Sequence, residues 1–115
     1  MTNPLKGEIE IELGSETYKA RLTIDAIVSI EQAVGCGIIK LATKMSEGDI
    51  SVSDMMAVLL PALRGGGNDF TQKDISKIIQ QAGIVSATTA VANLITTVLT
   101  VDDGDTDEKK PQEGV

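Results

Sequence analysis

The chain has 115 residues and a mass of 12.1 kDa, a size that suits one folding domain. It contains no histidine and one cysteine, Cys36, which excludes histidine-based catalysis, Cys–His nucleophiles, histidine-ligated metals and an internal disulfide. Seventeen acidic against ten basic residues give a net charge of −7, which disfavours nucleic acid and anionic membrane surfaces as partners. Only Tyr18 and Phe70 are aromatic, so we expect an aliphatic core.

The negative charge is concentrated at the C-terminus. Residues 102–115 hold six acids and two lysines, a charge of −4, and lack an apolar residue before Val115. This composition predicts a disordered acidic tail. Residues 1–101 then carry the remaining −3 and are expected to form a single α+β domain. The first residues contain no apolar signal segment, which predicts a cytoplasmic protein.

Two segments near the N-terminus alternate apolar and polar residues, the period of a half-buried strand. They are residues 8–13 and 18–22, and together they predict an antiparallel hairpin. A two-residue loop would pair the segments in a register that sets apolar against apolar and acid against base: Ile11 with Tyr18, Ile9 with Ala20, Glu10 with Lys19, and Glu8 with Arg21. A four-residue loop preserves this matching, so the turn itself is left open. With bases opposite the glutamates and no third element to supply a ligand, a solvated face is favoured over a cation site.

After the hairpin the apolar period becomes that of helices. The first helix follows Thr23 as N-cap and ends at Gly35. A short amphipathic helix then covers residues 38–45. The third helix spans residues 52–63 and begins with a capping-box spacing of Ser51 and Asp54.

The end of the third helix and the connection after it contain residues that disturb regular structure. Pro61 is expected to kink or end the helix, because proline removes a backbone hydrogen bond. The run Gly65–Gly67 lacks the lysine and the preceding strand of a phosphate-binding loop, so it is expected to be a flexible connection. A fourth helix begins with the second capping-box pair, Thr71 and Asp74, and ends before Gly83.

The last predicted helix, residues 84–101, is apolar on more than one face. It is either the central element of a small bundle or a helix that covers the core with one face and a partner with the other. The uncharged stretch 78–101 is long enough to span a bilayer, but nine polar residues and Gly83 speak against a membrane span. The predicted fold is therefore α+β: an N-terminal antiparallel β-hairpin followed by a bundle of four to five short α-helices.

No catalytic, cofactor-binding or metal-ligating site is predicted. The carboxylates at the starts of helices are explained by capping, and the tail acids with calcium-loop spacing fail the motif at Glu108 and Gly114. Cys36 has no adjacent cationic residue that would activate its thiol. Six apolar residues are candidates for contact with a partner protein, with a core role as the alternative for each: Met55, Met56, Leu59, Val91, Ile95 and Leu99.

The order of these segments resembles a known family. The resemblance rests on residues 3–8 before an alternating strand, Gly14, a second strand with Tyr18, the segment Leu22–Ile27 leading to Gly35, and the later helices of residues 52–63, 70–83 and 84–101. In this order and length the chain is similar to phage tail assembly chaperones of the gene-transfer-agent type. Pro61 and the glycine run depart from that pattern.

The resemblance implies a non-enzymatic protein without a cofactor, made while a long tail is assembled. It implies two partners, the tape measure protein, which is kept soluble, and the tail tube protein, which gathers round it. One alternative is a structural tail tube or tail-completion subunit that stays in the particle, and another is an acidic regulatory module of the host. A homo-oligomer formed through the hairpin or the last helix is a further expectation.

Overall fold

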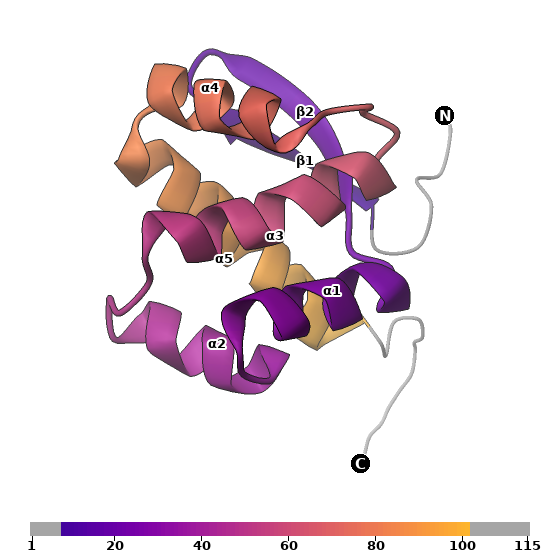
Figure 1. Cartoon of the computed structure of the whole chain (residues 1–115), viewed down its shortest axis with the longest axis vertical. Coiled ribbons are helices and arrows are strands. Elements are labelled where there is room, and N and C mark those ends of the chain that lie inside the picture. Colours follow the sequence, from indigo (N-terminus) through magenta and orange to yellow (C-terminus); the bar gives the residue numbers. More distant parts are fainter. Residues whose placement is uncertain (1–7, 102–115) are drawn as a thin grey trace.

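The computed structural model describes residues 8–101, which form two strands followed by five helices (Figure 1). The elements are β1 (Glu8–Leu13), β2 (Glu16–Arg21), α1 (Ile24–Val34), α2 (Ile38–Ser46), α3 (Val52–Gly65), α4 (Gln72–Ala82) and α5 (Ile84–Val101). The predicted α+β class and order of elements are confirmed. The predicted acidic tail lies outside the described residues, and the division of the chain at residue 101 stays a prediction.

The hairpin has the register that the alternation predicts. Ile11 pairs with Tyr18 and Glu10 with Lys19, and the closing pair is Leu13 with Glu16. The loop is therefore the two-residue one, Gly14–Ser15, in which Gly14 has a φ of 70° that favours glycine. The backbone N–H of Gly14 donates a hydrogen bond to Ser86 Oγ at 3.0 Å, which fixes the turn to the start of α5.

The helices and the inner face of the hairpin enclose one aliphatic core. Figure 1 shows the hairpin and α4 at one end of the molecule, α1 and α2 at the other, and α3 and α5 running between them. No polar or charged side chain is buried among residues 8–101. The largest fully buried side chains come from six of the seven elements: Ile11, Ile30, Leu41, Leu59, Leu63, Ile75, Leu94, Val58 and Val91. Burial of this apolar surface is the main term that stabilises the fold.

The helix boundaries follow from local capping. The side chain of Thr23 accepts a hydrogen bond from the Ala26 N–H at 3.1 Å, and the helix it starts ends at Gly35, as predicted. Gly37 begins α2 and offers no side-chain cap, but Glu31 Oε2 accepts a hydrogen bond from the Ile38 N–H at 2.9 Å. An acceptor from α1 thus satisfies a backbone donor at the start of α2.

Pro61 does not end α3, contrary to one of the two expected outcomes. The helix continues to Gly65, because proline removes only the single hydrogen bond that its own N–H would donate. The glycine run was also predicted to be a flexible connection. It does lead from α3 to α4, but two of its glycines serve close packing against β2. Gly65 is the last residue of the helix, and Gly66 lies against the backbone of β2.

Helix α5 packs against β1, α2, α3 and α4, so it contacts most of the other elements of the fold. Its buried side chains are Ala87, Ala90, Val91, Leu94 and Ile95. The helix nevertheless exposes apolar side chains near both ends, with Val85 81% and Leu99 41% exposed. No single helix within residues 8–101 is long and apolar enough to cross a membrane. The pairs α1–α2 and α4–α5 reach the required length and composition only together, across bends of 63° and 117°.

Candidate functional site

The last residues of α3 and the segment that joins α3 to α4 cover the outer edge of β2. A Cβ atom added at Gly65 would lie 2.3 Å from the carbonyl oxygen of Arg21, and one added at Gly66 would lie 2.2 Å from that of Lys19. Both distances are far inside van der Waals contact, so only glycine permits this approach of two backbones. The glycine run is therefore a packing feature of the hairpin.

Side chains of the same segment extend this contact. Asn68 Nδ2 donates hydrogen bonds to the carbonyl oxygens of Lys19, at 2.8 Å, and Leu63, at 3.0 Å. The Phe70 ring meets the Tyr18 ring edge to face, with centroids 5.7 Å apart, and Arg64 Nε donates to the Phe70 carbonyl. Sequence reasoning missed Asn68. The glycine run beside it could have indicated that this segment packs closely on another backbone, since consecutive glycines can mark a close backbone approach as well as a loop.

A shallow apolar groove of about 200 Å³ opens between α2 and α5. We call it the α2–α5 groove; its lining residues are Ala42, Met45, Ser46, Ala92, Ile95, Thr96 and Leu99. Ile95 is 2% exposed, whereas Leu99 is open to solvent. None of the lining side chains is charged, so the groove suits apolar side chains of another chain.

A second groove, of about 340 Å³, lies between α1 and α3. We call it the α1–α3 groove; it is lined by Ser29, Ala33, Ser53, Met56, Ala57, Leu60, Pro61 and Gln72. Its residues are small, aliphatic or uncharged polar. The half-buried Met56 supplies the flexible, polarizable side chain of the kind that adapts to different apolar partners.

The six candidate contact residues do not gather on one surface. Met55, Leu59 and Val91 are buried in the core. Ile95 and Leu99 line the α2–α5 groove, and Met56 lines the α1–α3 groove. A role in binding a partner stays a prediction for all six, and the grooves are where Ile95, Leu99 and Met56 could take part in it.

Residues 6–100 match the model of a protein family described as phage tail tube protein, GTA-gp10. The chain belongs to this family. The matched segment contains both strands and all of the helical residues described except Val101. The protein is thus a phage or gene-transfer-agent tail protein. No curated protein and no solved structure matches the chain.

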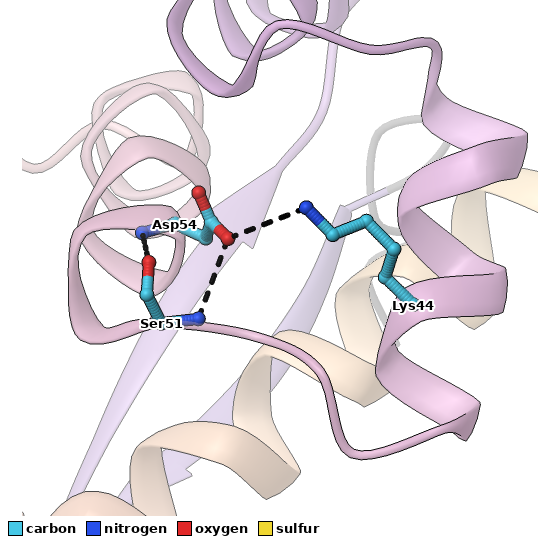
Figure 2. A network of polar contacts seen from close by, with 3 residues as sticks. All are labelled: Lys44, Ser51 and Asp54. Atoms are coloured by element: carbon cyan, nitrogen blue, oxygen red, sulfur yellow. Dashed lines mark hydrogen bonds and ion pairs between the residues drawn. The ribbon is translucent and has the colours of Figure 1, made fainter.

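In this tail protein, one polar network lies where α2 is followed by α3 (Figure 2). The Asp54 N–H donates to Ser51 Oγ at 3.1 Å, and the Ser51 N–H donates to Asp54 Oδ2 at 3.3 Å, which is the predicted capping box of α3. Figure 2 shows the Lys44 ammonium directed at the same carboxylate, 4.0 Å away. The network ties the end of α2 to the start of α3, and the cap contributes about 1 kcal/mol.

Two titratable side chains, Asp74 and Tyr18, have shifted pKa values, and both shifts arise from contacts that support the fold. Hydrogen bonds from the backbone and side chain of Thr71 lower the pKa of Asp74, and nearby Lys77 and Lys73 add to this effect. Burial raises the pKa of Tyr18, and the charge of Glu16 adds to it. Asp74 caps α4 in a second predicted capping box, and Tyr18 packs on Phe70. Residues 8–101 contain no group of three or more Cys, Asp or Glu side chains that could hold a metal ion.

Proposed function

We propose that the protein is a structural subunit of the phage tail, built into or onto the tail tube and retained in the particle. The observation that supports this most is the family match, which covers residues 6–100 and therefore nearly the whole described fold. The proposed role is non-enzymatic, and the shifted carboxyl of Asp74 is accounted for by helix capping. Assembly would take place in the cytoplasm of the host cell.

A second candidate function is that of a tail assembly chaperone, which the two apolar grooves favour. Amphipathic helices commonly bind by placing apolar side chains into grooves of this kind. A long helical tape measure protein would offer such side chains, and the tail tube protein would be the other partner. In this function the protein leaves before the particle is complete.

The composition of purified particles distinguishes the two functions. Tails would be purified from cells that express the full set of tail genes, and each protein quantified by mass spectrometry against labelled peptide standards. A structural subunit is expected at a fixed ratio to the other tail proteins. A protein that is absent from complete tails, but whose deletion abolishes them, would overturn the structural proposal in favour of the chaperone.

The grooves can be tested separately through Leu99, which is exposed at the rim of the α2–α5 groove. Leu99→Lys should leave the fold intact and reduce the amount of soluble tape measure protein when the two are co-expressed. The matched control is Val85→Lys on the same helix, because Val85 is more exposed and lines neither groove. Equal yields of soluble partner with both variants would show that this groove does not bind it.

A further inference from the structure

Among residues 8–101, no segment forms hydrogen bonds along the outer edge of β1 as Asn68 does with β2. The two-residue loop makes Leu13 and Glu16 a hydrogen-bonded pair, so the pairs along the hairpin alternate from that point. The backbone N–H and C=O groups of Glu10 and Glu12 therefore point away from β2. Within residues 8–101 these outward groups have no hydrogen-bond partner. Such an edge is a template for another strand.

The other edge of the hairpin is closed to strand addition. Gly65 and Gly66 lie against the carbonyls of Arg21 and Lys19, and Asn68 already donates a hydrogen bond to the Lys19 carbonyl. A strand that approached β2 would have to displace this segment and the packing of Phe70 on Tyr18. A third strand can therefore join the sheet only beside β1.

The charge along β1 specifies which strand would fit. The exposed side chains of Glu10 and Glu12 share one face with Glu8, while Ile9 and Ile11 face the core. On the β2 side, Glu10 lies opposite Lys19, but Glu12 lies opposite the uncharged Thr17. A strand added to the outer edge of β1 would place its own side chains next to these glutamates, on the side opposite to β2. Lysine or arginine at alternate positions is favourable there, and acidic residues are unfavourable.

A second copy of the chain does not meet this requirement. Pairing β1 with β1 of another copy, with both apolar faces on the same side, sets glutamates beside glutamates. Pairing β1 with β2 of another copy is prevented by the segment that covers β2. The hairpin is thus a poor site for the expected homo-oligomer, and the strand must come from a different protein.

We propose that β1 accepts an extended segment of a partner protein in which basic residues alternate with β-branched residues. The backbone of the segment pairs with Glu10 and Glu12, and its basic side chains lie beside the glutamates. This interaction is separate from both grooves, and it is compatible with a subunit retained in the particle and with a chaperone. It goes beyond the proposed function by naming the edge and the chemistry of the segment it binds.

The test uses the full chain and a short synthetic peptide in which lysine and valine alternate. Binding would be measured by isothermal titration, with an isomer of the peptide that groups its lysines together as a charge-matched control. Glu10→Pro removes the outward N–H without disturbing the hairpin ladder, whereas Glu10→Gln removes the same charge and keeps the N–H. Thr17→Pro makes the equivalent change on β2 and controls for the effect of proline on the hairpin.

The alternating peptide should bind, and Glu10→Pro should weaken it by about fivefold or more relative to Glu10→Gln, the factor expected for a lost backbone hydrogen bond. Thr17→Pro should bind as the unchanged protein does. Circular dichroism would verify that each variant is folded. Equal affinity for both peptides, or equal affinity of Glu10→Pro and Glu10→Gln, would reduce the interaction to charge attraction and overturn the proposal.

Discussion

The two edges of the hairpin are protected from unwanted pairing by different physical means. The edge of β2 is covered by backbone, at Gly65 and Gly66, and by the Asn68 side chain. Within residues 8–101 the outward backbone groups of Glu10 and Glu12 on β1 have no hydrogen-bond partner, and the alternating glutamates of this edge disfavour pairing with a second copy. The segment that covers β2 prevents any strand from pairing there, whereas the glutamates of β1 disfavour only strands that carry acidic residues. The edge of β1 is therefore selective for the strand it pairs with, and the edge of β2 accepts none.

The largest expected effect comes from breaking the cover on β2. Gly66→Ala would place a Cβ atom 2.2 Å from the Lys19 carbonyl oxygen, so the segment must move off the strand. We expect a loss of about 3 kcal/mol or more in the free energy of unfolding, measured by urea denaturation.

The matched control for this substitution is Gly37→Ala, because a Cβ atom there would meet only Glu31 Oε2, at 3.7 Å. It should change the free energy of unfolding by no more than about 1 kcal/mol. If Gly66→Ala is as mild as this control, the close approach of the two backbones is not required for the fold.

Asn68→Ala tests the polar part of the same cover. It removes the hydrogen bonds to the Lys19 and Leu63 carbonyls and should cost about 1 to 3 kcal/mol of stability. Asn93→Ala, an exposed position on α5, should change stability by less than about 0.5 kcal/mol. Thermal or urea unfolding of the pair would give the difference, and its absence would remove Asn68 from the cover.

The capping box after the covering segment should contribute less. Thr71→Ala removes the hydroxyl that accepts a hydrogen bond from the Asp74 N–H at 3.2 Å, which should cost about 1 kcal/mol in the free energy of unfolding. Thr71→Ser keeps the hydroxyl and should cost clearly less. Equal losses for the two variants would show that the methyl group, not the cap, is what matters at this position.

Acid should weaken the same cap. Hydrogen bonds from Thr71 hold the pKa of Asp74 below its ordinary value, so the carboxylate stabilises the fold more than its protonated form does. This contribution is complete above the pKa of the unfolded chain and is lost as the pH falls below about 4. The Asp74→Asn variant should show a smaller loss of stability over that range in acid titrations followed by circular dichroism. Parallel curves for the two proteins would contradict this assignment.

The sequence was most informative where structure is local. The register of the hairpin follows from the parity of alternating residues, and the capping boxes at Ser51 and Thr71 follow from the spacing to the next acid. Each involves residues close together in the chain, for which spacing determines geometry.

The contacts that cover β2 could not be predicted in this way. Asn68 and Lys19 are 49 positions apart, and nothing in either residue's neighbourhood specifies that they meet. The same holds for the separation of the six candidate contact residues. Met55 and Met56 are adjacent in the sequence, yet one is buried in the core and the other lines a groove, because the packing of the other helices decides which side chains of α3 are covered.

The contrast between the two edges can be measured directly by residue-resolved amide hydrogen exchange of the full chain. If β1 has a free edge, the outward N–H groups of Glu10 and Glu12 exchange rapidly, while the inward N–H groups of Ile9 and Ile11 are protected. Adding the alternating lysine–valine peptide should slow exchange at Glu10 and Glu12 and leave Lys19 unchanged. Protection of Glu10 and Glu12 equal to that of Ile9 and Ile11 in the free protein would contradict an open β1 edge.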